Sequence, residues 1–465
     1  MIGIKYKRRD FMPMNRQKLS IRNLFLVGFT LFSMFFGAGN LIFPPFLGAQ
    51  AGQESWKAMA GFLVSAAGLP VLGVAAAALA GGLEKLAGRV GPHFAAVFPV
   101  LIYLFIGPCL AIPRTASTSF EMTVLPAANA LGIDLEGRFL GVQGAFAAQA
   151  GYSVLFFIVA VLLSLKPERL TDRLGKVLCP TLLILIAVIF TGCLVWPVGI
   201  PSGPEASYRS APALKGFLEG YGTMDTLAAL NFGIVIAMNV REKGVNQEGF
   251  VVWETIKAGL IAGLLLALVY SALAYVGAPV GSAAGKGANG ARILSYVAGS
   301  LFGDAGRAIL GFIFFIACLN TCVGLLCCCS QFFSVRFPCL GYRQWMGVFA
   351  AASLFISSAG LDIILRLSEP VLLAVYPVAI VLILLSFFDR LFERYRGVYV
   401  WSVVFTGVVS VIYGLQTAGL ALPGNWLALW LPGYEAGFGW ILPAAAGILL
   451  GMVFGHSMQN GKRDL

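Results

Sequence analysis

The chain has 465 residues, of which 59% are hydrophobic and 11% are charged, and its formal net charge is +11 at pH 7. Soluble globular domains carry about a quarter charged residues, so this composition excludes an ordinary soluble domain and is typical of a polytopic membrane protein. At roughly 20 residues for each spanning helix plus its loop, the length accommodates about a dozen spans. A basic segment, residues 1–20, leads directly into the first span without the short apolar core and cleavage site of a signal peptide.

The first apolar run, residues 24–51, is long enough to cross a bilayer but is interrupted in its middle. It contains Gly37, Gly39 and Asn40, followed by a Pro-Pro pair. A helix that breaks at membrane depth frees backbone N–H and C=O groups, which cost several kcal/mol each in lipid unless something satisfies them. A bound ion or a polar substrate is the usual partner, so the interruption predicts a transport site near the middle of the bilayer.

The unwound residues Gly37, Ala38 and Gly39 are expected to face a substrate. Their N–H groups and the positive end of the following half-helix would attract a carboxylate. The alternative is close packing of helices through small residues. Asn40 either offers its side-chain oxygen to a cation or hydrogen-bonds the freed backbone. The aromatic residues next to the interruptions are expected to line an apolar pocket: Phe35, Phe36 and Phe232.

Charged residues inside two other spans are expected to act in gating or in an ion network. Arg114 and Glu121 in the third span lie seven residues apart, on one helix face but about 10 Å from each other, so a pair between them needs an intermediary. Arg366 and Glu369 in the tenth span are three residues apart and can pair directly. They form either an outer gate or a satisfied pair near the water interface.

The sixth apolar segment, Gly220 to Gly233, is a second interrupted span. Thr223 and Asp225 within it are expected in the substrate site. An acid at the bilayer centre costs about 2.5–3.5 kcal/mol on insertion scales, so Asp225 should face a cavity. There it would meet a substrate ammonium, a coupling cation or a proton. The alternative is that Asp225 caps the second half-helix.

Interrupted spans at matching positions, five spans apart, indicate two five-span repeats of inverted topology. The twelve expected spans lie near residues 21–50, 56–82, 93–125, 147–165, 175–198, 219–240, 251–279, 303–331, 342–359, 361–387, 397–418 and 434–456. The expected organisation is a basic tail (1–20), a ten-span core (21–387, with repeats 21–198 and 219–387), two accessory spans (397–456) and a second tail (457–465).

The distribution of basic residues predicts the orientation of the chain. With the N-terminus in the cytoplasm, most basic residues fall in inner loops and tails, as the positive-inside bias requires. The inner set includes Lys166, Arg169, Arg173, Lys176, Arg390, Arg394 and Arg396. Both termini are therefore expected in the cytoplasm, and the loops 199–215 and 280–302 outside, with short helices in them. This topology accounts for the net charge, so no nucleic-acid partner is expected beside the lipid bilayer.

Five stretches of the chain resemble one transporter family. Phe35 to Gly48 (FFGAGNLIFPPFLG) is similar to the first-span signature of the bacterial branched-chain amino acid:cation symporters. The other similar stretches are Ile106 to Glu121, Gly222 to Gly233, Ala317 to Gly324 (ACLNTCVG) and Tyr376-Pro377 with the apolar run 379–383. The resemblance covers nearly the whole chain and implies an all-α, LeuT-type 5+5 inverted repeat plus two spans. It also implies symport of leucine, isoleucine and valine with Na+ or H+ across the bacterial inner membrane, without an organic cofactor.

The resemblance also implies a cation site between the first and eighth spans. The carbonyls of Ser33 and Phe36 would contribute from the first span, and the carbonyl of Ala317 with the side chains of Asn320 and Thr321 from the eighth. Residues 317, 320 and 321 share one helix face, and oxygens of this kind suit a hard cation. Asn320 stands where the family pattern has a smaller or hydroxyl residue. The alternative is a polar pair that holds two helices together.

Other functions remain as alternatives. A symporter of the same fold could carry another small amino acid or a nucleobase. A multispan membrane enzyme needs clustered histidines or cysteines, or a nucleophile with a base, and the sequence has only two histidines and no such cluster. Repeated pore motifs of a channel and a GxxxxGK[ST] nucleotide loop are also absent from the sequence. The chain is therefore not expected to be an enzyme, and the sequence makes no prediction of its oligomeric state.

Overall fold

The structure, a computed structural model, describes residues 18–133, 138–139, 142–165, 179–285, 287–392, 395, 397–420 and 425–460. Its regular elements are helices, apart from a hairpin of two short antiparallel strands, β1 (Arg138–Phe139) and β2 (Val142–Gln143). Most of the expected basic tail lies outside the described residues. So do the predicted inner-loop residues Lys166, Arg169, Arg173, Lys176, Arg394 and Arg396.

The helices of the first half of the chain begin with an interrupted pair. In order they are α1 (Ile21–Phe35), α2 (Ala38–Ala51), η1 (Gly52–Glu54), α3 (Ser55–Leu63), η2 (Val64–Gly68), α4 (Leu69–Ala80), α5 (Leu83–Gly88), α6 (Pro92–Leu104), η3 (Phe105–Cys109), α7 (Ala111–Ala130), α8 (Gly144–Ser164) and α10 (Cys179–Val195).

The second half begins with short helices that lead into another interrupted pair. The elements are α11 (Ala206–Arg209), α12 (Pro212–Glu219), η6 (Gly220–Thr223), α13 (Asp225–Glu242), α14 (Glu248–Gly277), η7 (Gly281–Ala284), α15 (Gly290–Arg336), α16 (Tyr342–Ser357), α17 (Leu361–Phe387), α18 (Asp389–Phe392), α19 (Gly397–Thr417), α20 (Asn425–Trp430) and α21 (Ile441–Asn460).

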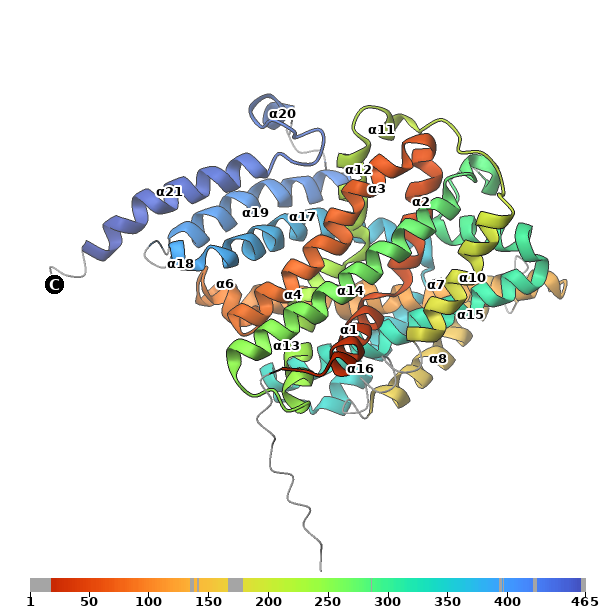
Figure 1. Ribbon diagram of the computed structural model, residues 1–465, viewed down its shortest axis with the longest axis horizontal. Coiled ribbons are helices and arrows are strands. Elements are labelled where there is room, and N and C mark those ends of the chain that lie inside the picture. Colours follow the sequence, from red (N-terminus) through yellow and green to blue (C-terminus); the bar gives the residue numbers. More distant parts are fainter. Residues whose placement is uncertain are drawn as a thin grey trace, which may run out of the picture.

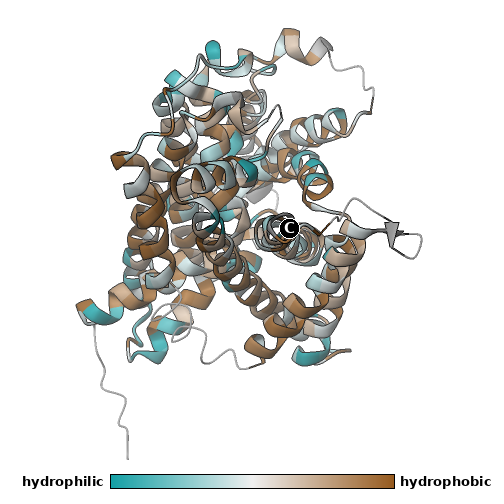
Figure 2. Cartoon of the chain, turned by 90° about the vertical axis from the view of Figure 1, so that its right-hand side faces the viewer, coloured by the Kyte–Doolittle hydropathy of each residue, from teal (hydrophilic) through white to brown (hydrophobic). Residues whose placement is uncertain are grey.

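Every one of the twelve expected spans contains a helix over most of its range. Among the described residues, seven helical segments are long and apolar enough to cross a membrane, and the segment 212–223 with α13 forms one further span bent by 49°. Three shorter apolar helices, α1, α10 and the first part of α21, accompany them. Figure 2 shows hydrophobic residues predominating along the helices. The expected outer loops do contain short helices, namely α11, η7 and the start of α15.

The helices pack around α1 and α15. In the most hydrophobic 18-residue stretch of α15, 78% of the residues are buried inside the protein, against 28% for α8. The central helix is therefore enclosed by protein, whereas most residues in the corresponding stretch of α8 are not buried inside the protein. Helix α7 packs along α15, α13 along α4, and α14 along α1 and α2. In this arrangement the two interrupted helices lie in the interior.

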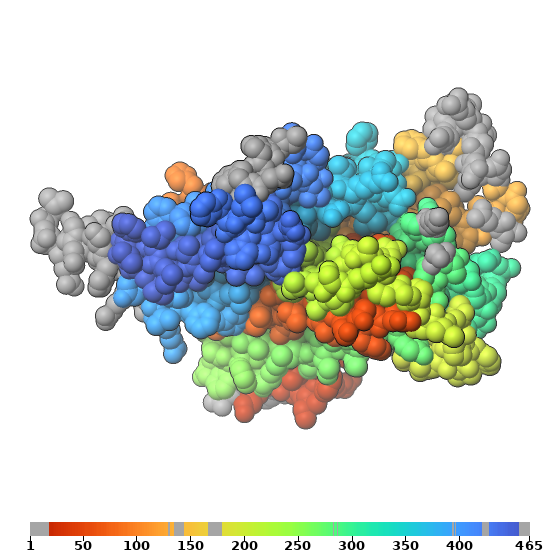
Figure 3. All heavy atoms as spheres, turned by 90° about the horizontal axis from the view of Figure 1, so that it is seen from above, coloured from red at the N-terminus to blue at the C-terminus, as the bar shows by residue number. Residues whose placement is uncertain are grey.

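The last two spans form a layer at one end of the molecule. Helix α19 packs between α17 and α21 (Figure 1), and the same blue group occupies one end in the view from above (Figure 3). Residues of α11 and α12 lie near the centre of that upper face (Figure 3). The interrupted helices are thus covered by neighbouring helices and short loop helices, and the accessory spans lie apart from them.

Candidate functional site

The first interruption is two residues long. Phe36 and Gly37 are extended between α1 and α2, while the N–H of Phe36 still donates to the Phe32 carbonyl at 2.8 Å. The freed N–H of Gly37 donates to Asn40 Oδ1 at 3.0 Å. Of the two roles considered for Asn40, the structure therefore has the hydrogen bond to the freed backbone.

The second interruption lies at Met224, which has φ 65° and is the one non-glycine residue of positive φ in the described part of the chain. Such a conformation is uncommon for a residue with a Cβ and marks a strained turn. Thr223 stabilises this turn, since its Oγ1 donates to the Gly220 carbonyl at 2.9 Å and accepts from the Asp225 N–H at 3.4 Å. Thr223 and Met224 both reach the cavity described below.

A buried triad of side chains joins the two interruptions. Asn40 Nδ2 donates to Asp225 Oδ2 at 2.6 Å and also to the hydroxyl of Tyr270 on α14. The Tyr270 hydroxyl donates to the same Asp225 oxygen at 2.8 Å. All three residues are at most 2% exposed. The Asp225 carboxylate thus bonds to two other helices, and the expectation that it caps α13 through that helix's own N–H groups finds no hydrogen bond in the described structure.

Arg114 reaches the second interruption from α7. Its Nη1 donates to the Gly222 carbonyl at 2.7 Å, and its Nη2 lies 3.5 Å from the Thr223 carbonyl. The guanidinium also lies over the ring of Phe43, 5.9 Å from its centroid. Carbonyls at the end of a helix carry partial negative charge, so Arg114 stabilises the end of η6.

Glu121, on the same helix, belongs to a different group of charges. Its Oε1 accepts from Asn289 Nδ2 at 3.2 Å and from Arg292 Nε at 3.3 Å, and Arg292 also lies 3.9 Å from Asp362. The structure therefore places Arg114 and Glu121 in separate contacts. This second cluster connects α7, the beginning of α15 and α17 near the end of the bundle.

Arg366 and Glu369 do not form the direct pair that their spacing permits. Both are exposed, and no ion pair within 4.0 Å joins them in the described part of α17. They instead line a vestibule of about 630 Å³, counted as the volume open to the centre of a water molecule. Phe43, Arg114 and Asn289 line the same vestibule.

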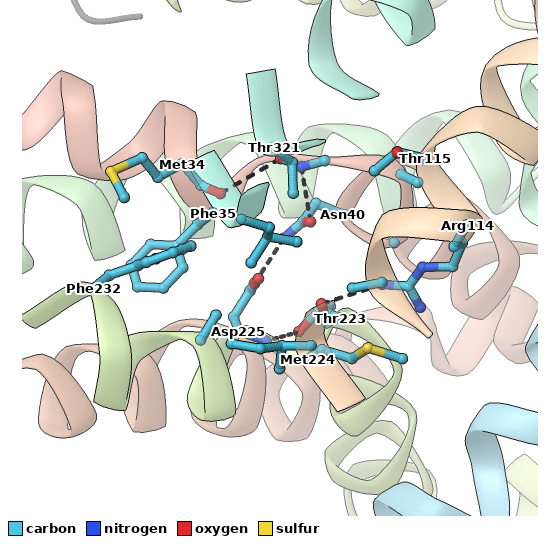
Figure 4. Close-up of a pocket in the computed structure, with 17 residues that line it drawn as sticks. Met34, Phe35, Asn40, Arg114, Thr115, Thr223, Met224, Asp225, Phe232 and Thr321 are labelled. Carbon is cyan, nitrogen blue, oxygen red and sulfur yellow. Dashed lines mark hydrogen bonds between the residues drawn. The ribbon is translucent and has the colours of Figure 1, made fainter. Parts of the chain in front are cut away.

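A narrow cavity lies between the two interruptions (Figure 4). By the same measure its volume is about 20 Å³, which is room for about one water molecule. Its lining combines the α2 N-terminus with two charged side chains, four uncharged polar ones (Asn40, Thr115, Thr223 and Thr321) and apolar residues: Met34, Phe35, Gly37, Ala38, Gly39, Asn40, Ile106, Ala111, Arg114, Thr115, Thr223, Met224, Asp225, Ala228, Phe232, Thr321 and Leu325. Arg114 lines both this cavity and the vestibule, so it lies at the boundary between them.

The predicted aromatic pocket is formed by two of the three residues named for it. Phe35 and Phe232 line the cavity, with ring centroids 5.4 Å apart. The ring of Phe36 instead stacks on Phe32 at 5.1 Å and faces Tyr270. Consecutive residues at the end of a helix point in different directions, so adjacent Phe35 and Phe36 cannot both face one side.

The candidate cation residues meet where α1 ends beside the middle of α15. Asn320 Nδ2 donates to Ser33 Oγ at 3.0 Å, and Thr321 Oγ1 lies 3.4 Å from the Met34 carbonyl, to which it donates. Asn320 Oδ1 is buried without a hydrogen-bond partner. Ala317 is fully buried one turn earlier on the same helix. No three His, Cys, Asp or Glu side chains gather in a metal-binding arrangement within the described residues.

Tyr270 was not singled out from the sequence, although one signal was available. It lies within the 30-residue apolar helix α14, and a buried tyrosine hydroxyl normally requires a partner. The burial of this hydroxyl alone predicts a polar partner on another helix. It does not predict that the partner is Asp225, because α13 and α14 are aligned only by tertiary packing.

Comparison with known proteins identifies relatives over nearly the whole chain. A family model described as "Branched-chain amino acid transport protein" matches residues 20–458. The chain is 40% identical to the branched-chain amino acid permease BraB of Bacillus subtilis, covering 94% of this chain and 96% of the relative. It is 39% identical to the branched-chain amino acid transport system 2 carrier protein of Pseudomonas aeruginosa (93% and 95% covered) and 36% to the permease BrnQ of Escherichia coli K12 (94% and 96%).

A solved structure shares the fold. The transporter Mhp1 of the nucleobase-cation-symport-1 family, in a closed conformation with bromovinylhydantoin bound, matches with a TM-score of 0.57 at 12% identity. The match covers 92% of this chain and 91% of the other. The likeness concerns the fold alone, which is the LeuT-type arrangement that the motifs implied.

Proposed function

We propose that this chain, which belongs to the branched-chain amino acid transport protein family, is a secondary active symporter. Its family membership makes it a multi-pass membrane transporter rather than an enzyme. It imports leucine, isoleucine and valine together with Na+ or H+ by alternating access. The membrane is the bacterial inner membrane, with both termini in the cytoplasm. No organic cofactor takes part.

The observation that carries this proposal is the cavity between the two interrupted helices. An amino acid is a zwitterion, and the cavity offers it the α2 N-terminus for the carboxylate and Asp225 for the ammonium. Phe35, Phe232 and the neighbouring aliphatic residues offer an apolar surface to a branched side chain. A site with one pole of each sign and apolar walls matches leucine, isoleucine and valine better than a nucleobase, which carries neither charge.

The unequal sizes of the cavity and the vestibule support alternating access. The vestibule is open, whereas the cavity holds about one water, so an amino acid can reach Arg114 but needs a wider cavity to bind beyond it. In the predicted orientation the vestibule faces outward, since residues Ser207, Lys215 and Asn289 of the outer loops line it. Movement of the interrupted helices would then open and close the cavity.

Transport in proteoliposomes tests the proposal. Radiolabelled leucine uptake is measured under separately imposed Na+, Li+ and H+ gradients, with unlabelled amino acids and uracil as competitors. We expect accumulation above equilibrium with a Na+ or an H+ gradient, and competition by isoleucine and valine. Uptake that only equilibrates under every gradient would exclude symport, and the absence of leucine uptake under every gradient would exclude the branched-chain substrate.

The coupling cation, if it is Na+, is expected to bind near Asn320 and Thr321. The buried, unpaired Asn320 Oδ1 is an oxygen that a cation would satisfy, and the next residue of α15, Thr321, donates through Oγ1 to the Met34 carbonyl at the facing end of α1. Together with Ser33, Phe36 and Ala317, these groups supply neutral oxygens of the type that hard cations prefer. The same contacts also serve the alternative role of holding α1 against α15.

Thr321→Ala separates these roles. Losing one oxygen ligand should raise the Na+ concentration for half-maximal leucine uptake by about tenfold, with a much smaller change in leucine affinity at saturating Na+. Thr191→Ala is the matched control, since that exposed hydroxyl donates to the Ala187 carbonyl of its own helix. Unchanged Na+ dependence in Thr321→Ala, or uptake that follows pH and ignores Na+, would remove this site from the mechanism.

A further inference from the structure

Arg114 is a buried cation with unused hydrogen-bonding capacity. It is 3% exposed, and its guanidinium carries five N–H donors. Only the 2.7 Å bond to the Gly222 carbonyl is short, because the contact with the Thr223 carbonyl, at 3.5 Å, lies at the limit of a hydrogen bond. Nε is buried without a partner, and within the described residues Arg114 forms no ion pair.

Two neutral carbonyls do not replace a counter-ion. A buried charge without a paired opposite charge is costly, and buried charges in proteins are paired or hydrogen-bonded in full. Arg114 meets this requirement only in part, although it borders the cavity between the two interruptions. The N–H donors of Arg114 that have no acceptor are therefore available to a ligand that enters that cavity.

The guanidinium lies directly against the first turn of α2. A Cβ at Gly39 would be 2.7 Å from Arg114 Nη2 and 3.1 Å from Cζ, so only glycine allows the two to approach this closely. The first N–H groups of a helix have no acceptor inside the helix, and the N-terminus carries partial positive charge. Arg114 and the start of α2 therefore form one electropositive wall, which favours an anion.

The opposite pole of the cavity is Asp225. Figure 4 shows Arg114 and Asp225 reaching the cavity from different helices, with Thr223 and Met224 drawn between them. The Asp225 carboxylate bonds to Asn40 and Tyr270, and within the described residues no ion pair within 4.0 Å joins it to Arg114. A ligand with one charge of each sign would satisfy both.

We propose that Arg114 binds the α-carboxylate of the substrate, together with the N–H groups of the first turn of α2. Its planar fork matches a carboxylate, and its position at the boundary with the vestibule lets it engage the carboxylate as the substrate enters. Arg114 is then the residue by which the transporter distinguishes amino acids from amines. The inference rests on the proposed function, because it takes this cavity as the substrate site.

Ligands that lack one charged group test the assignment. Binding to the purified full-length protein is measured by competition against radiolabelled leucine, or directly by calorimetry, for leucine, leucinamide and 4-methylpentanoate. In Arg114→Gln, leucine affinity should fall roughly 30- to 100-fold while leucinamide affinity changes less than about threefold. Arg114→Lys keeps the charge without the fork and should lie between the two.

Each outcome decides the assignment. Equal losses for leucine and leucinamide in Arg114→Gln would mean that Arg114 only stabilises the end of η6, and would overturn the proposal. If neither variant folds, arginine modification of the wild-type protein by phenylglyoxal, read at Arg114 by mass spectrometry, decides instead. Protection by leucine and 4-methylpentanoate but not by leucinamide supports the proposal, and equal protection or none overturns it. Failure of the wild-type protein to bind any branched-chain amino acid would instead reject the proposed function.

Discussion

Asp225→Asn is expected to reduce leucine uptake about 100-fold or more. In the wild type the carboxylate accepts from Asn40 and Tyr270 with one oxygen, Oδ2, and is a charged group lining the cavity. An asparagine can keep those two donors only by turning its oxygen toward them, which leaves its NH2 group facing the substrate. The cavity then loses its negative pole, and the loss of one partner of a buried charge pair costs about 2–5 kcal/mol. Initial uptake rates in proteoliposomes measure the effect.

Two further variants make the Asp225 result specific. Tyr270→Phe removes one of the two donors and keeps the charge, so a smaller reduction, about tenfold, is expected. Asp304→Asn changes an acid whose side chain is 80% exposed and should leave uptake unchanged. Near-normal transport by Asp225→Asn, with the protein inserted at wild-type levels, would show that the charge has no part in transport.

The interruption of two spans could be predicted from the sequence because its signal is local. Gly37, Gly39 and Asn40 within one apolar run cannot continue a lipid-exposed helix without satisfying freed backbone groups, and the structure interrupts the helix at Phe36 and Gly37. The prolines at 44 and 45 belong to the same sequence signal, but the helix is not interrupted there, because both lie inside α2. The motif resemblance is confirmed by the family match, and the LeuT-type fold by the shared architecture with Mhp1.

The connections between spans could not be predicted, because they depend on how helices far apart in the sequence are aligned. Asn40 and Asp225 are separated by 185 residues, and Asn40 and Tyr270 by 230. Helical periodicity places Arg114 and Glu121 on one face, yet their separation of seven positions along α7 puts the first beside the cavity and the second in the cluster with Arg292. Periodicity gives the face of a helix, whereas the depth of each partner follows from packing.

Gly39→Val is expected to abolish leucine uptake while the protein still inserts into the membrane. A Cβ at this position would lie 2.7 Å from Arg114 Nη2 and 3.2 Å from the Gly222 carbonyl, so a branched side chain must displace the guanidinium and cover the first N–H groups of α2. The positive pole of the cavity is then blocked, whichever of its groups holds the carboxylate. Uptake and the amount of protein recovered in membranes are measured together.

Two further glycine variants separate a steric effect at the substrate site from misfolding of the protein. Gly39→Ala adds one methyl group, which Arg114 can avoid in part because its guanidinium is the far end of a flexible side chain, so residual uptake is expected. Gly151→Val makes the same change on α8, where a Cβ meets nothing within 4 Å and the residue is exposed, and it should transport normally. Full leucine uptake by Gly39→Val would mean that the substrate does not approach the first turn of α2. Because the added atoms occupy the space that the first turn of α2 shares with Arg114 and the Gly222 carbonyl, their effect on leucine uptake measures whether the substrate uses this space.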